Sequence, residues 1–417
     1  MLVKTILNRV ERLKGFVYGE VGWGQWQGAR CLEVGLRARK GSRPVCSGCG
    51  QAGPTYDHLG ERRFQFVPLW GIAVFFLYAM RRVDCPSCGV KVEEVAWADG
   101  KHFLTRRFQW FLARWAKRLS WQAVGECFGV SWHYVFTSVE MAVAWGRARM
   151  DLGGIEAIGI DEMQWGRGQQ YVTMAYQIDE GRRRLLWIGA ERKAKTLLRF
   201  FRWLGQERTA RVRFICSDMW RPYLKVVAKK AGQALHILDR FHIVAHLNKA
   251  LDEVRRGEAG ELRRQGSEPV LRASRWCLLK RPENLTQRQK PRLRELLRLN
   301  LRTVRAYLLK EDFQFLWGYV SPAWAGRFLD QWCERTIRSR IEPLKRVART
   351  LRDHRELILN WFRARKRFSA GVVEGLNNKA KLTTKQAYGF HTLKCLEIAL
   401  YHTLGDLPEP ESAHRFS

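Results

Sequence analysis

One stretch of the chain constrains the fold more than any other, because its pattern changes from strand runs to alternating helices and strands. Three strand-like runs come first, separated by glycine-containing turns: 155–163, 171–178 and 184–188. Helices and strands then alternate over four segments: 194–204, 211–217, 223–231 and 234–238. Three meandering strands followed by this alternation predict a mixed α/β sheet, in the order of a ribonuclease-H-like core.

Two acidic side chains lie where core strands end. Asp161 follows an apolar run, and Asp218 directly follows the next core strand. Glu162 is the neighbour of Asp161, but successive side chains of a strand point to opposite faces, so only one of the two can join a site. We choose Asp161, because the apolar alternation ends there at the edge of the sheet.

A third carboxylate, Glu374, opens a helix-like stretch near the end of the chain. Three polar residues follow it at spacings of four, three and four and share its helical face: Asn378, Lys381 and Lys385. A metal ligand and cations suited to phosphates therefore lie on one helix. Glu356 and Glu397 also lie on C-terminal helices, and the residues alone leave them open as alternatives.

Oxygen ligands from two strand ends and one helix suit hard divalent cations such as Mg²⁺ or Mn²⁺. Two such ions about 3.5–4 Å apart stabilise the attacking and leaving oxygens of an in-line phosphoryl displacement. Capping of turns is the alternative role for a strand-terminal aspartate. After the last core strand, Asp239 and His242 can orient a phosphate or a water, and a helix cap with a satisfied histidine is the equally open alternative.

The charge of the chain indicates a polyanionic partner. Its 417 residues include 74 Lys and Arg against 40 Asp and Glu, a formal net charge of +34. Such a surface attracts nucleic acid by counterion release. The most apolar window, 68–80, is shorter than the ~20 residues that span a bilayer, and the first residues lack the order of a signal peptide. We therefore expect no membrane association.

Four of the ten cysteines form two tight pairs, Cys46-x-x-Cys49 and Cys85-x-x-Cys88, with a hairpin expected between them. Four thiolates in such pairs can close a tetrahedral zinc site. Chance spacing and redox cysteines are the alternatives. Because four protein ligands leave no open position, we expect a structural zinc ion and no catalytic one.

Residues 120–135 fit a helix-turn-helix unit that reads DNA. Gly129 supplies the turn, Ser131 caps the second helix, and four apolar residues form the shared core: Val124, Phe128, Val130 and Val135. The exposed start of the second helix carries three aromatic or imidazole side chains: Trp132, His133 and Tyr134. Two helices packed for structural reasons alone are the alternative.

Residues 241–370 contain almost no strand pattern, and their leucines repeat at helical spacing. Within them, 253–370 carries 29 Lys and Arg against 13 Asp and Glu, a net charge of +16. This segment is predicted to be a basic, all-helical insertion. The proline-containing end of the chain, 407–417, is predicted to be a flexible tail.

These motifs together resemble bacterial insertion-sequence transposases of the Asp-Asp-Glu type, in the ISL3-type family. The resemblance spans nearly the whole chain and rests on six segments: 43–49, 158–162, 217–220, 238–242, 373–381 and 388–390. It implies that Asp161, Asp218 and Glu374 are the catalytic triad, which selects Glu374 over its alternatives. Lys385 stands about where such sequences often carry Arg, and a lysine lacks the bidentate fork.

The expected fold class is multidomain α+β, with an N-terminal zinc-binding β module, a helix-turn-helix and a ribonuclease-H-like core interrupted by the helical insertion. Six segments follow in order: a zinc-binding domain at 1–98, a helix-turn-helix region at 99–150, the first part of the core at 151–252, the insertion at 253–370, C-terminal core helices at 371–406 and the tail at 407–417.

The expected function is binding of the terminal inverted repeats of an insertion sequence, followed by metal-dependent cleavage and transfer of DNA strands. A nuclease without strand transfer and a non-catalytic DNA-binding regulator are the alternatives. Partners would be double-stranded element ends, target DNA and further copies of the chain, in a dimer or larger synaptic assembly at the bacterial nucleoid in the cytoplasm. Seven residues are expected to contact DNA: Trp132, His133, Tyr134, Asn378, Lys379, Lys381 and Lys385.

Overall fold

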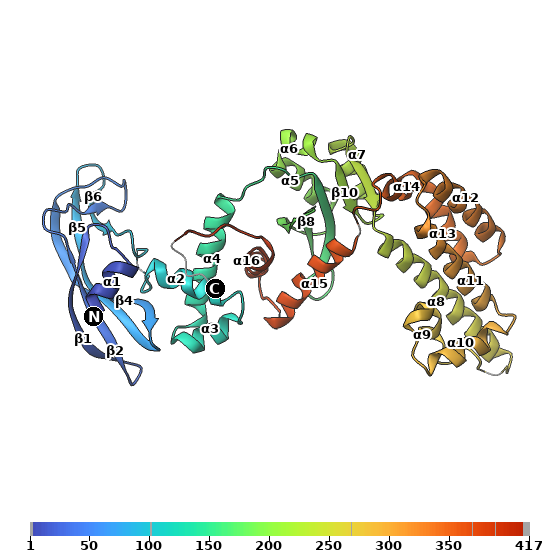
Figure 1. Cartoon of the computed structure of the whole chain (residues 1–417), viewed down its shortest axis with the longest axis horizontal. Helices are drawn as coiled ribbons and strands as arrows, with labels where there is room; N and C mark the ends of the chain where they lie inside the picture. Colours follow the sequence, from blue (N-terminus) through green and yellow to red (C-terminus); the bar gives the residue numbers. More distant parts are fainter. Residues whose placement is uncertain (1–2, 101, 268, 369, 388, 412–417) are drawn as a thin grey trace. The chain divides into compact units, whose positions relative to one another are not determined.

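The computed structural model describes residues 3–411 except 101, 268, 369 and 388, and it contains both helices and strands (Figure 1). The chain divides into two compact units. The first comprises Met1–Asp151 and Thr383–Ser417, and the second comprises Leu152–Leu382. In the part of the chain so described, no helix combines the length and the apolar character that crossing a bilayer requires.

An antiparallel-rich sheet forms most of the first unit, with α1 (Val3–Val10) beside it. Its strands are β1 (Phe16–Trp26), β2 (Ala29–Ala38), β3 (Val45–Cys46), β4 (Thr55–Leu69), β5 (Ile72–Cys85) and β6 (Gly89–Glu94). The order is β1-β2-β5-β6-β3, and β4 pairs with β5 as the predicted hairpin. Phe64, Phe76 and Trp97 meet edge to face in the core of this unit, which adds directional contacts to apolar burial.

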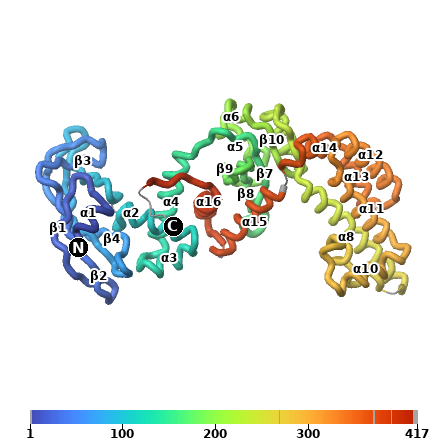
Figure 2. The backbone as a smooth tube through the Cα atoms, viewed as in Figure 1, coloured from blue at the N-terminus to red at the C-terminus, as the bar shows by residue number. Residues whose placement is uncertain are grey.

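Four helices complete the first unit: α2 (Arg106–Trp115), α3 (Trp121–Phe128), α4 (Trp132–Ala148) and α16 (Leu393–Leu404). The chain returns to α4 through α16, as Figure 2 traces. The sequence grouped α16 with the core helices of 371–406, whereas the structure clusters everything from Thr383 with the N-terminal unit. In the predicted flexible tail, Glu409 forms ion pairs with Arg114 and Lys117, so this part of the segment is attached to the first unit. Residues 412–417 lie outside the described part.

A five-stranded mixed sheet forms the centre of the second unit. Its strands are β7 (Ala157–Gln164), β8 (Tyr171–Asp179), β9 (Arg182–Ala190), β10 (Phe214–Ser217) and β11 (Leu235–Leu238). The order is β11-β10-β7-β8-β9, with β10 parallel to both neighbours and β7, β8 and β9 antiparallel. The connecting helices are α5 (Ala194–Leu204), α6 (Gln206–Arg211) and α7 (Arg221–Lys230). Every strand and helix predicted between 155 and 238 is present.

The described residues of the segment predicted to be an all-helical insertion, 253–370, form helices and no strand, and the first helix begins earlier, at Arg240. The elements are α8 (Arg240–Arg264), α9 (Arg275–Leu279), η1 (Pro282–Asn284), α10 (Gln289–Leu297), α11 (Arg302–Phe313), η2 (Gln314–Gly318), α12 (Pro322–Arg338), α13 (Glu342–Asp353) and α14 (Arg355–Arg363). The side chain of Asn360 donates to the carbonyl of His236, which fastens α14 to β11. The last helix of the second unit, α15 (Ala370–Gln386), runs across the boundary between the units.

Candidate active site and metal centre

Two of the predicted carboxylates lie side by side at the neighbouring strands β10 and β7, at the end of the second sheet that we call the carboxylate edge. Cys216 pairs with Gly159, so β10 ends beside the middle of β7, and Asp218 follows at the height of Asp161. Strand β7 continues past Asp161 to Gln164 and stays paired with β8 over that length. Asp161 is thus paired with Met174 of β8 on one side, and on its other side β10 has already ended.

Helix α15 packs against the face of the sheet to which Asp161 points. Asn377 donates to one carboxylate oxygen of Asp161 and accepts from the hydroxyl of Tyr176 at 2.8 Å. Gly159 permits this close packing, because a Cβ there would lie 2.5 Å from the side chain of Val373. The second oxygen of Asp161 accepts from the backbone amide of Glu162 at 2.8 Å.

Asp218 is fixed by a different set of groups. Its Oδ1 accepts from the amide of Trp220 at 3.0 Å, and its Oδ2 accepts from Nη2 of Arg192 at 2.9 Å. Arg192 also donates to Glu162 at 3.1 Å and lies over the ring of Trp220 at 4.7 Å. One guanidinium therefore joins two carboxylates, which compensates two largely buried charges with one cation.

Glu162 faces away from Asp161, as strand alternation predicts. It pairs across the ladder with Thr173, whose hydroxyl lies 2.6 Å from that of Tyr223 on α7. Helix α7 therefore covers the face that carries Glu162, and α15 covers the face that carries Asp161. The two catalytic candidates Asp161 and Asp218 lie at the edge between these faces.

Three acids in this region, Asp161, Glu162 and Asp239, have a raised pKa. Burial raises the pKa of Asp161, and burial followed by repulsion from Asp218 raises the pKa of Glu162 to about 7. Burial also raises the pKa of Asp239 to about 6, although His242 nearby acts in the opposite direction. A cation would offset the repulsion between these carboxylates, and carboxylate oxygens are the ligand type that hard divalent ions prefer.

Glu374 is exposed on α15, one helical turn before Asn377. Among the residues that the structure describes, it makes no hydrogen bond or ion pair. The alternatives from the sequence are engaged elsewhere, since Glu356 pairs with Arg355 and Arg363, and Glu397 pairs with Arg147. The three carboxylates of the predicted triad are nevertheless not gathered as tightly as the cysteines described next.

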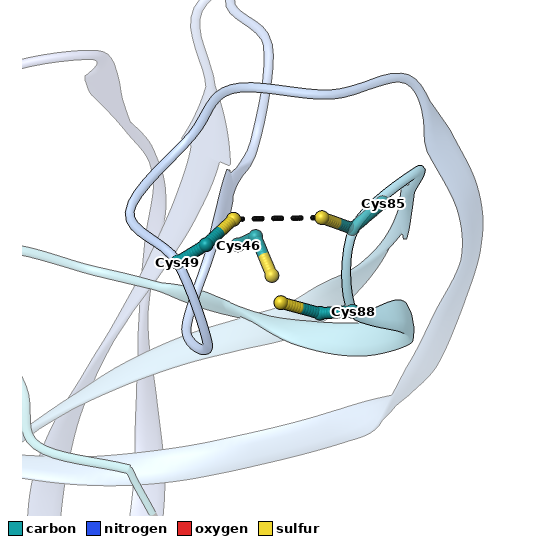
Figure 3. A group of neighbouring side chains, drawn as sticks. All are labelled: Cys46, Cys49, Cys85 and Cys88. Atoms are coloured by element: carbon teal, nitrogen blue, oxygen red, sulfur yellow. Dashed lines mark hydrogen bonds between the residues drawn. The ribbon is translucent and has the colours of Figure 1, made fainter.

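Within the described residues, the cysteines form the one group of three or more potential ligand side chains that is close enough to share an ion. The Sγ atoms of Cys46, Cys49, Cys85 and Cys88 all lie within 4.8 Å of one another, and those of Cys49 and Cys85 are 3.5 Å apart (Figure 3). A tetrahedral zinc site with bonds of about 2.3 Å places sulfurs about 3.8 Å apart. The cluster fits such an ion.

The residues predicted to contact DNA are accessible. Trp132 is 57% exposed at the start of α4, His133 is exposed, and Tyr134 is partly buried beside His102. Gly129 ends α3 with a φ of 65°, as the predicted turn requires. Ser131 occupies the N-cap of α4, but its hydroxyl makes no capping hydrogen bond. The four predicted contacts on α15 are exposed: Asn378, Lys379, Lys381 and Lys385.

Sequence reasoning missed two residues that hold the carboxylates. Asn377 has a detectable signal, because it follows Glu374 by three residues and shares its side of the helix. Arg192 has no such signal, because it reaches Asp218 only through the order of the sheet. Asn377 donates to Asp161 and Arg192 donates to Asp218, the two strand carboxylates that were predicted from the sequence.

Comparison with known proteins defines the class. A family model described as a transposase, of the ISL3 type, matches residues 158–400. The chain is 29% identical over 393 residues to the transposase for insertion sequence element IS1001 of Bordetella parapertussis, covering 94% of this chain and 95% of that one. It is 30% identical over 413 residues to the transposase for insertion sequence element IS1557 of Mycobacterium tuberculosis, covering 93% and 91%. The chain belongs to the ISL3-type family of insertion-sequence transposases.

Proposed function

We propose that this transposase binds the terminal inverted repeats of its element and holds two Mg²⁺ or Mn²⁺ ions with Asp161, Asp218 and Glu374. The observation that carries the proposal is the meeting of Asp161 and Asp218 at one sheet edge, with α15 attached to Asp161 through Asn377. Glu374 precedes Asn377 by one turn, so a change of side-chain rotamer can bring its carboxylate toward the same edge. The strand order and the placement of the helices support a ribonuclease-H-like core.

The surrounding residues have distinct roles in this proposal. Asn377 orients Asp161, and Arg192 orients Asp218 while compensating its charge. When bound, the divalent ions would activate the attacking oxygen and stabilise the leaving oxygen of the phosphodiester. The exposed cations of α15 would hold the phosphates of the element's end beside Glu374.

The first unit would recognise the element's end. A zinc ion held by the four cysteines would stabilise the sheet, and the sheet in turn contacts the helix-turn-helix. Gln27, at the tip of the β1–β2 hairpin, donates to the carbonyl of Gly129 at 3.5 Å, and Gln65 donates to that of Phe128 at 3.4 Å. These contacts support the turn before α4, whose Trp132 and His133 would face the DNA.

Strand transfer requires both element ends together, so a dimer or larger synaptic assembly acting in the bacterial cytoplasm at the nucleoid belongs to this proposal. The basic insertion would add phosphate contacts. The segment boundaries expected from the sequence remain part of the proposal, with the qualification that α16 packs on α4.

Asp161→Asn tests the catalytic role. Glu162→Gln, at the adjacent residue on the opposite face of the sheet, is the variant for comparison. We expect Asp161→Asn to lower nicking of a repeat end about 1,000-fold or more, because several kcal/mol of transition-state stabilisation are lost. Repeat binding should persist in a gel-shift assay. Repeat binding without nicking by the wild-type protein would favour a non-catalytic regulator, and an unchanged nicking rate of Asp161→Asn would contradict the catalytic role of Asp161. Wild-type protein that cuts pre-assembled ends but joins none to a plasmid would favour a nuclease.

A further inference from the structure

A groove of about 960 Å³ lies between α5 and α7, on the face of the sheet that carries Glu162. Five of its lining side chains are cationic: Arg202, Arg221, Lys225, Lys229 and Lys230. None of the described residues that line it is acidic, and most of the others are apolar. The groove is therefore a positive surface that is not neutralised from within.

The cations of this groove are mostly free of partners. Arg221 approaches Asp353 at 3.9 Å, and the other four make no ion pair with any residue that the structure describes. The nearest helix, α6, contributes Glu207, but that carboxylate pairs with Arg211 on its own helix. The positive charge is thus available to a ligand.

Helix stability does not account for this arrangement. Lys229 and Lys230 lie in the last turn of α7, where the helix dipole favours cations. Arg221 lies in the first turn, where the dipole opposes a cation. Arg221, Lys225 and Lys229 are also spaced four residues apart, so like charges repel along one stripe. A polyanion bound in the groove would neutralise these charges, so relief of the repulsion would favour binding.

The groove begins at the catalytic edge. Helix α5 starts at Ala194, two residues after Arg192, and α7 starts at Arg221, three residues after Asp218. Both helices therefore begin close in sequence to the edge where phosphates would react, although in α7 Pro222 has no amide hydrogen and the amide of Tyr223 donates to the carbonyl of Trp220. The ten residues of α7 span about 15 Å, which matches about four base pairs of DNA along its axis.

We infer that this groove holds the sugar–phosphate backbone of the target DNA during strand joining, an inference that rests on the proposed function. Two DNA segments must reach one centre, and the sheet offers one basic helix on each face: α15 beside Asp161 and α7 beside Glu162. Lysine and arginine contacts to phosphates carry no sequence information, and among the described residues that line the groove Gln206 is the one with an amide side chain. Such a surface suits a DNA that is accepted without a fixed sequence.

The test compares Lys225→Glu/Lys229→Glu with Arg183→Glu, a control at an exposed residue of the edge strand β9 that does not line the groove. Pre-cleaved repeat ends, Mg²⁺ and a supercoiled plasmid report joining, while an uncleaved repeat end reports binding and nicking. We expect the groove variant to join at least tenfold fewer ends than the control at about 0.15 M salt, with a much smaller change in nicking. The salt dependence of joining should flatten by about two log units per log unit of salt, since two phosphate contacts are lost.

Joining equal to that of the control would overturn the inference. An equal loss of nicking and joining would also overturn it, because the groove would then hold the element's end. Lys225→Gln/Lys229→Gln, which removes charge without reversing it, should give an intermediate loss if the protein remains folded. Failure of the proposed function is separate, since Asp161→Asn would then nick and join as the wild type does.

Discussion

The two candidate metal centres of this transposase differ in how far the protein alone assembles them. The four cysteines lie on short turns at the ends of β3 and β5, and their sulfurs are already within one ligand sphere of one another. The carboxylates come from a sheet edge and from α15, and Glu374 remains exposed. The comparison indicates that two local turns assemble the cysteine cluster, whereas the carboxylates depend on packing between segments that are distant in sequence.

Electrostatics separates the two centres further. At the carboxylate edge, protein groups already balance part of the charge, since Asn377 donates to Asp161 and Arg192 pairs with Asp218. At the cysteine cluster, the amide of Gly48 donates to the sulfur of Cys46 at 3.4 Å. Removing an ion should affect folding at the cysteine cluster and chemistry at the carboxylate edge.

The largest expected effect follows removal of zinc from the cysteine cluster. Cys85→Ser, or a chelator, should remove binding free energy on the order of 10 kcal/mol from the first unit, because a structural zinc ion contributes directly to folding. Thermal unfolding followed by calorimetry measures the loss, and metal analysis counts the zinc. Cys127→Ser, at an exposed cysteine outside the cluster, should unfold as the wild type does. Equal stability of Cys85→Ser and Cys127→Ser would contradict a structural metal.

The next largest expected effect is a loss of nicking activity with no change in stability. Glu374→Gln should lower end nicking about 1,000-fold or more while leaving the unfolding temperature unchanged, because Glu374 makes no hydrogen bond or ion pair among the described residues and is proposed to supply an ion ligand. Nicking assays and calorimetry on one preparation measure both. Glu397→Gln, which breaks the ion pair with Arg147, should keep its activity. Retained nicking by Glu374→Gln would mean that another acid supplies the third ion ligand.

The smallest expected effect concerns Arg192. Arg192→Ala leaves Asp218 and Glu162 without their shared cation, so we expect a loss of about 1–2 kcal/mol in the free energy of unfolding, with allowance for the exposure of the arginine. Denaturant titration without and with Mg²⁺ measures it. Mg²⁺ should recover part of the loss, because an ion at the same edge replaces the missing charge. A loss that is identical with and without Mg²⁺ would argue against an ion there.

Much of the candidate site could be predicted because its residues carry local signals. The spacing of the cysteine pairs, the position of Asp218 after a strand and the spacing on α15 are all short-range patterns. Asn377 and Arg192 could not be predicted as partners, because their contacts depend on which strands are neighbours. The packing of α16 on α4 was missed for the same reason, since a helix sequence does not state which surface covers its apolar face.

The sequence by itself determined the elements of the second sheet, the helical nature of the insertion, the cysteine cluster and the family of this transposase. Alternation, helical periodicity and motif spacing act over a few residues, so they can be read along the chain. Only the tertiary structure decided that α15 covers the face of Asp161 and α7 the face of Glu162, that Arg192 joins two acids, and that a basic groove starts beside Asp218. These features arise from strand order and long-range packing, which bring together residues that are distant in sequence.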